Sequence, residues 1–164
     1  PAWRPEFTLT IRGPGNPEYL SSLRDQIAVL RLEARVMLAP PVAMTELVRA
    51  ATAFDVGLFS LPGHSLQNKY ALPNKFFEYV MAGLALCVSD LPEMTSLVAR
   101  YRLGVLIAGT QPASIAAALN QLDRDAINEY RQNALTAARE LSWDRESQRL
   151  VQAYEELVPP GKPG

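Results

Sequence analysis

Short apolar segments that each lead into a helical segment constrain the fold of this chain more than any other feature. The clearest is the run 84–88, which is apolar throughout and follows a helical pattern that ends at Gly83. A strand with apolar residues on both faces is typical of a parallel sheet covered by helices on both sides. The other segments with strand character are residues 7–12, 35–38, 55–59 and 104–107. We therefore predict an α/β fold with a doubly wound parallel sheet of about five strands.

Helical periodicity fills the connections between these strands and continues to the C-terminal end. After Gly109 the strand patterns stop, and helices are predicted over residues 113–122, 126–140 and 142–157. In the last helix we expect a buried apolar stripe that docks it on the domain, formed by Trp143, Ser147, Leu150, Val151, Tyr154 and Leu157. We expect residues 1–158 to form a single domain, and the Pro- and Gly-rich residues 159–164 to be a disordered tail.

Composition and charge exclude several classes of function. The formal net charge of -1 gives no basic surface for nucleic acid or for an anionic membrane. The longest apolar run, about ten residues, is well short of the ~20 that a membrane span needs. With one histidine and one cysteine, Cys87, there is no metal-ligand cluster and no internal disulfide. We expect a cytoplasmic protein without a signal peptide, in which Cys87 is an inert buried thiol.

Candidate ligand-binding residues follow the predicted strands, because ligands of such sheets sit beyond the carboxyl ends of the strands. The helix that begins near Asn74 carries Lys75 in its first turn and Glu78 one turn further on. Its backbone N–H groups, partial positive charge and lysine suit a phosphate. Glu78 is placed to accept hydrogen bonds from sugar hydroxyls.

Several of these motifs together resemble one enzyme family. They are FDVGLFS at 54–60, LPNKFFEY at 72–79, AGL at 82–84, SDLPE at 89–93, and LSW at 141–143 with Tyr154 and Leu157. This ordered series resembles the C-terminal half of the retaining GT-B glycosyltransferases called family 4, or glycosyl transferases group 1. The resemblance covers residues 7–157.

The resemblance implies a Rossmann-like domain that binds a nucleoside diphosphate sugar. It further implies transfer with retention of configuration, no bound metal or other cofactor, and an N-terminal acceptor domain in the same full-length chain. A location peripheral to a membrane is compatible with it. Glu78 matches the glutamate that binds the ribose, Val42 the position whose backbone contacts the base, and residues 72–75 the helix start that faces the diphosphate and sugar.

Three positions depart from the family pattern. Tyr70 replaces a glutamate that reads the donor sugar, and Pro73 replaces a glycine. The family's diphosphate-binding Arg and Lys follow a first strand that would precede Phe7, so we expect the chain to lack the first strand-helix unit and to be inactive alone. Our candidates for donor binding are Glu78, Lys75, Asn74, Tyr70, His64, Val42 and Gly13. No catalytic residue is evident.

Some residues and functions keep alternative interpretations. His64 either contacts the donor or is an exposed loop residue, and Tyr70 either contacts the sugar or packs its loop on the sheet. Gly13 lies in a motif that is too short for a dinucleotide fingerprint, so a tight turn is its alternative role. A GT-B sugar-nucleotide epimerase shares the architecture. A non-catalytic interaction module would also fit the loss of the glutamate at Tyr70.

Overall fold

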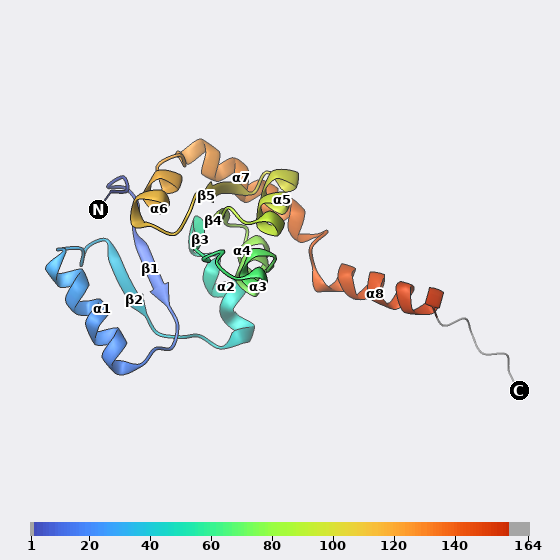
Figure 1. Cartoon of the computed structure of the whole chain (residues 1–164), viewed down its shortest axis with the longest axis horizontal. Coiled ribbons are helices and arrows are strands. Elements are labelled where there is room, and N and C mark those ends of the chain that lie inside the picture. The colour runs from blue at the N-terminus through green and yellow to red at the C-terminus, as the bar shows by residue number, and fades with distance from the viewer. Residues whose placement is uncertain (1, 158–164) are drawn as a thin grey trace, which may run out of the picture.

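The computed structural model describes residues 2–157. Five strands run β1 (Leu9–Arg12), β2 (Val36–Ala39), β3 (Val56–Phe59), β4 (Ala85–Ser89) and β5 (Gly104–Ile107). The helices are α1 (Pro17–Val29), α2 (Leu47–Ala51), α3 (Leu66–Lys69), α4 (Asn74–Met81), α5 (Pro92–Tyr101), α6 (Pro112–Leu119), α7 (Arg124–Ala138) and α8 (Trp143–Leu157), with a 3-10 turn η1 (Met44–Glu46) before α2. Strands and helices alternate as the sequence predicted (Figure 1).

The strands form two parallel sheets. β1 pairs with β2, in register Leu9 to Val36, whereas β3, β4 and β5 form a second sheet in that order. The structure therefore confirms five parallel strands. In the described part of the chain they do not form one continuous sheet, because β1 does not pair with β3. This division separates the molecule into two unequal halves (Figure 1).

The core lies around β4, whose five residues are all buried. Leu86 and Val88 face one cluster that includes Phe76 of α4 and Met94 of α5. Ala85 and Cys87 face the other, with side chains from α6, α7 and their connection. Because successive side chains of a strand point to opposite faces, the continuous apolar run gives both faces a core. Each large side chain buried there stabilises the fold by roughly 1.5–3 kcal/mol relative to exposure.

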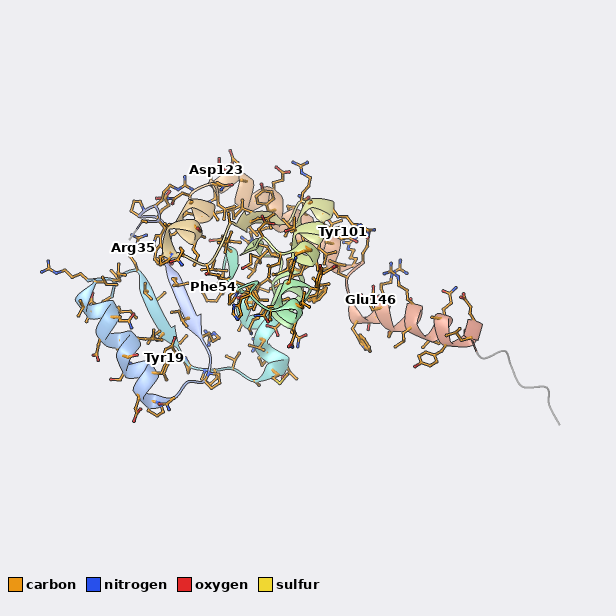
Figure 2. The ribbon with its side chains drawn as sticks, viewed as in Figure 1. Tyr19, Arg35, Phe54, Tyr101, Asp123 and Glu146 are labelled. Atoms are coloured by element: carbon orange, nitrogen blue, oxygen red, sulfur yellow. The ribbon has the colours of Figure 1, made fainter. Side chains whose placement is uncertain are left out.

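The half that contains β1, α1 and β2 is much less covered. Val36 is its only buried residue among those described, and Ile11 and Met37 are 41% and 50% exposed. Figure 2 shows the same contrast, because side chains crowd around β3, β4 and β5 and are sparse around β1 and β2. The smaller sheet thus has apolar side chains that the described residues do not cover.

Two glycines allow helix α4 to pack closely. A Cβ atom on Gly57 of β3 would lie 2.4 Å from the ring of Tyr79, so only glycine lets this part of α4 approach the strand. Gly83 follows the helix with φ of 68°, a left-handed conformation that glycine adopts without strain. The position of α4 is therefore fixed from both the strand side and its C-terminal end.

The prediction of a buried stripe on the last helix is wrong. Helix α8 projects away from the body of the molecule and has no buried residue (Figure 1). Trp143 is 73% exposed and Tyr154 64% exposed, and Leu150, Val151 and Leu157 are exposed as well; Ser147 is half-buried. The periodicity correctly predicted an amphipathic helix, but periodicity does not specify which surface covers the apolar face. The predicted tail, 159–164, lies outside the described residues.

Candidate functional site

The amino end of helix α4 forms the centre of the candidate site. Asn74 is its first residue, as the sequence predicted, and Pro73 occupies the N-cap position without a side-chain hydrogen bond. Its first turn contains no acidic residue. The first N–H groups of a helix carry partial positive charge, and here no side-chain cap takes them up. This end of α4 therefore favours an anion.

Lys75 and Glu78 form an ion pair at this helix end. The Lys75 Nζ atom lies 3.0 Å from Glu78 Oε2, and the two side chains are 47% and 25% exposed. Residues three apart share one face of a helix, which brings the ammonium and the carboxylate together. An exposed pair of this kind stabilises a fold little, so it is free to exchange partners with a ligand.

Both residues line a cavity of about 800 Å³ between β1 and β3. Arg12, Ser60 and Tyr79 line it as well. Arg12 is the last residue of β1, and its Nη1 donates to the carbonyl of Pro40 at 2.8 Å. Arg12 was not among the predicted donor-binding residues, although its position at the end of a predicted strand was an available signal. The cavity wall thus carries two cations, Lys75 and Arg12, and one carboxylate.

Tyr79 connects the helix to the neighbouring strand. Its hydroxyl donates to the carbonyl of Leu58 in β3 at 3.2 Å. Burial raises the pKa of the Tyr79 phenol, and the charge of Glu78 raises it further. The phenol therefore stays protonated and can act as a hydrogen-bond donor.

Ser89, the last residue of β4, and Asp90, which follows it, organise the loops at this edge. Ser89 is buried, and its hydroxyl accepts a hydrogen bond from the backbone N–H of Leu61 at 2.7 Å. Asp90 accepts from the hydroxyl of Thr95 at 2.7 Å. Ser89 therefore fixes the start of the loop that leads from β3 to α3.

Of the other predicted site residues, Asn74 adjoins Lys75 at the start of α4, whereas Gly13, Val42, His64 and Tyr70 do not line the cavity that holds Lys75 and Glu78. Gly13 lines a second hollow, of about 500 Å³, beside Pro40 and Pro41. His64 and Tyr70 are exposed residues that flank α3, and the ammonium of Lys69 lies 5.6 Å from the Tyr70 ring. The half-buried Val42 precedes η1, and Asn74 is exposed. Neither cavity is lined by Val42, His64, Tyr70 or Asn74.

Two further observations concern function. Among residues 2–157, no group of three or more His, Cys, Asp or Glu side chains is arranged to hold a metal ion. Within the same range, no helix is both long enough and apolar enough to cross a bilayer.

Residues 1–125 match the family model described as "Glycosyl transferases group 1". The chain belongs to this family. None of the curated proteins matches the sequence.

Two solved structures share the fold of nearly the whole chain. One is the pneumococcal O-GlcNAc transferase GtfA in complex with UDP and GlcNAc, with a TM-score of 0.69, 18% identity, and coverage of 95% of this chain and 30% of that one. The other is Anabaena Alr3699/HepE in complex with UDP-glucose, with a TM-score of 0.68, 19% identity, and coverage of 94% and 42%. The architecture is thus that of a Rossmann-like GT-B domain, and the chain spans less than half the length of either protein.

Proposed function

We propose that this chain is the donor-binding half of a glycosyltransferase that takes its sugar from a nucleoside diphosphate sugar. The observation that carries the proposal is the Lys75–Glu78 pair on the cavity wall at the uncapped amino end of α4. Family membership and the fold of UDP-bound proteins support the same assignment.

The proposed binding mode exchanges the partners of the ion pair. A diphosphate at the start of α4 takes the Lys75 ammonium and the first backbone N–H groups of the helix. The Glu78 carboxylate, released from Lys75, then accepts hydrogen bonds from the ribose hydroxyls. Charged hydrogen bonds of this kind contribute about 1.5–3 kcal/mol each.

The same groups act on the reaction. As the sugar leaves, negative charge develops on the diphosphate, and Lys75 with the helix start stabilises it in a preorganised position. The held ribose fixes the orientation of the donor. The proposal assigns no general base and no nucleophile to this chain.

The remaining parts of the proposal concern the longer protein. An N-terminal acceptor domain in the same polypeptide closes on the donor, the acceptor being unidentified, and transfer retains the anomeric configuration. Around the bound donor, we place the backbone of Val42 near the base, Asn74 near the diphosphate, and Tyr70, His64 and Gly13 in the surrounding loops. We propose a cytoplasmic site of action, and little turnover by the isolated domain.

Calorimetric titration with UDP, GDP and ADP tests the proposal, using the chain extended at its amino end by its natural sequence. We expect binding of at least one nucleotide, and a loss of more than about 1 kcal/mol on Glu78→Ala, as expected for a charged hydrogen bond. Glu129→Ala is the matched control, because Glu129 Oε1 lies 2.7 Å from Arg102 Nη2 in an exposed pair that does not line the cavity. Absence of heat with all three nucleotides would refute donor binding and favour an interaction module.

A further inference from the structure

The segment that leaves β2, residues 40–43, connects the smaller sheet to η1. It begins with Pro40 and Pro41, which have no backbone N–H and therefore cannot continue the ladder between β1 and β2. Val42 follows and is half-buried, and Met44 begins η1. In the described part of the chain, no strand holds this segment by backbone pairing.

A single side chain of β1 ties the segment to the sheet. Arg12 lies in register with Ala39, directly before the segment, and its Nη1 donates to the Pro40 carbonyl at 2.8 Å. Among residues 2–157, residues 40–42 form no other hydrogen bond. Within the same residues Arg12 belongs to no ion pair. No described carboxylate therefore competes with the Pro40 carbonyl for the guanidinium.

The two consecutive prolines carry the position of this carbonyl to Val42. A proline ring fixes φ at about −65°, and a residue that precedes a proline is restricted to extended conformations. Pro40 is restricted in both ways, because Pro41 follows it. Few backbone torsions are therefore free between the Pro40 carbonyl and Val42, so the hydrogen bond from Arg12 also limits where the Val42 amide lies.

The backbone N–H of Val42 is free to bind a ligand. It has no hydrogen-bond partner in the part of the chain that the structure describes. A half-buried N–H group without a protein partner is a donor that a ligand can use. Val42 is also the residue whose backbone we place near the base of the donor. A donor on a segment that is already held costs less to order on binding than a donor on a mobile loop.

We infer that Arg12 is a positioning residue for recognition of the base. It holds the Pro40–Pro41 segment so that the Val42 backbone meets the base in a fixed place. The inference rests on the proposed binding of a nucleoside diphosphate sugar for the identity of the ligand. Because Arg12 acts through the Pro40 carbonyl, its loss weakens the contact with the base and leaves the contacts at the start of α4 intact.

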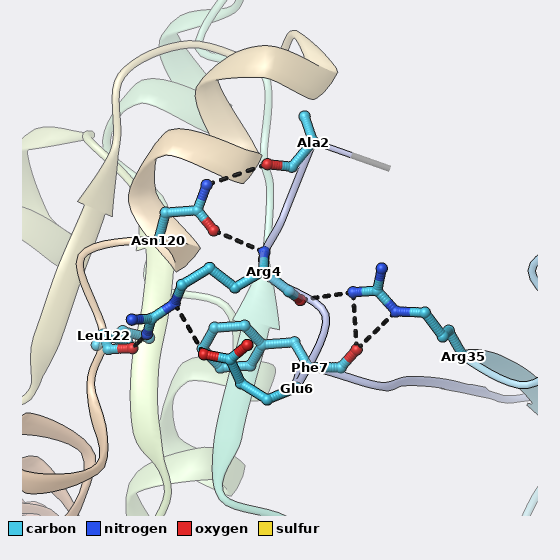
Figure 3. Close-up of polar contacts among 7 residues, drawn as sticks. All are labelled: Ala2, Arg4, Glu6, Phe7, Arg35, Asn120 and Leu122. Atoms are coloured by element: carbon cyan, nitrogen blue, oxygen red, sulfur yellow. Dashed lines mark hydrogen bonds and ion pairs between the residues drawn. The ribbon is translucent and has the colours of Figure 1, made fainter.

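A second arginine, at the other end of the same two strands, is a matched control (Figure 3). Arg35, directly before β2, donates from Nη2 to the Arg4 carbonyl at 2.6 Å. Its Nε and Nη2 donate to the Phe7 carbonyl at 3.2 and 3.1 Å. Arg35 thus ties the chain before β1 to β2 at the amino ends of the strands, whereas Arg12 forms its bond at the carboxyl ends. Loss of Arg35 loosens the sheet without touching the Pro40 carbonyl.

Residue-resolved NMR on the chain used for calorimetry tests the inference first without ligand. Arg12→Met keeps much of the side-chain length and removes every donor, Arg12→Lys keeps a cationic donor, and Arg35→Met makes the same change at the amino ends. Arg12→Met should lower the backbone order parameters of Val42 and Ala43 from about 0.85 to below about 0.6. Arg12→Lys should restore them at least in part, and Arg35→Met should leave them unchanged.

Titration of the same proteins with UDP, GDP and ADP adds the ligand. For the nucleotide that the original chain binds most tightly, Arg12→Met should weaken binding by about fivefold or more, because the loop must then be ordered on binding. The chemical-shift changes of the Val42 and Ala43 amides should shrink, whereas those of the Lys75 and Glu78 amides should persist. Arg35→Met should preserve both sets of shift changes.

Three results would overturn the inference. Unchanged order and shift changes at Val42 in Arg12→Met would show that the segment needs no tether. Equal loss of the shift changes at Val42 and at α4 would show that Arg12 contacts the diphosphate itself. The same loss of order at Val42 in Arg35→Met would assign the effect to general loosening of the sheet.

The two arms separate this inference from the proposed donor binding. Absence of nucleotide binding would refute donor binding, and with it the contact to the base, while the order parameters still report whether Arg12 holds the segment. Nucleotide binding that depends on Glu78 but not on Arg12 would refute the positioning role alone.

Discussion

The close approach of β3 and α4 at Gly57 gives a quantitative test of how the site is positioned. A Cβ atom on Gly57 would lie 2.4 Å from both Cγ and Cδ2 of Tyr79 and 2.9 Å from its Cβ. Real contacts of this kind lie beyond 3 Å, so Gly57→Ala must push α4 away from the strand. Overpacking in a core costs about 1–3 kcal/mol, against which alanine gains roughly 0.5–1 kcal/mol over glycine in a strand.

A double-mutant cycle separates the clash from other effects of the substitution. Tyr79→Ala removes the ring and leaves only the contact at 2.9 Å. Tyr79→Ala alone should cost up to about 3 kcal/mol through the cavity it creates. In that background Gly57→Ala should cost less than in the original chain, with a coupling free energy of at least about 1 kcal/mol.

Urea unfolding followed by circular dichroism measures the free energy of unfolding of the original chain, the two single variants and the double variant. The dependence of this free energy on urea concentration should be similar in all four, so that the values can be compared. Ala99→Gly, at an exposed position of α5, is a control for the general effect of exchanging alanine and glycine. If the effects of Gly57→Ala and Tyr79→Ala add within about 0.5 kcal/mol, the proposed contact does not limit the position of α4.

Two further predictions concern Cys87 and helix α8. Burial raises the pKa of the Cys87 thiol from 9.0 to about 12. Between pH 9 and pH 12 the folded state therefore keeps a proton that the unfolded state loses. This contribution to the free energy of unfolding is fully present below pH 9, and the free energy should fall by up to about 1.4 kcal/mol per pH unit as the pH rises from 9 to 12. Cys87→Ala should remove this component in urea unfolding between pH 8 and 10.5, and an unchanged pH dependence would contradict the assignment. Removal of α8 should change the unfolding free energy by less than about 0.5 kcal/mol, because the helix buries no residue; a loss of several kcal/mol would show that its apolar face packs on this domain.

Local sequence signals predicted the strands and helices well. β5 has the predicted bounds, Gly104–Ile107, and α4 begins at the predicted Asn74. The short α3 was missed because four residues are too few to show a helical period. The division between β1 and β3 was not predicted, since hydrophobic periodicity reports burial but not the order of strands.

The candidate site was partly predictable for a similar reason. Lys75 and Glu78 are separated by about one helical turn, so their shared face follows from the sequence. Arg12 joins them only in the folded structure, where β1 lines the same cavity. Their proximity depends on two segments that lie far apart in the sequence. His64 and Tyr70 were placed after the correct strand, but their orientation depends on the loop around α3.

The burial of Cys87 has a practical consequence for measuring motion in this molecule. The chain's single thiol lies within the central strand of the larger sheet and remains protonated at neutral pH, so labelling reagents that need an exposed thiolate have no native target. A cysteine introduced at an exposed position therefore becomes a unique attachment point for a spin label or fluorophore. Two introduced cysteines, one on α1 and one on α7, would carry labels that report the distance between the two halves directly, and Cys87 need not be replaced first.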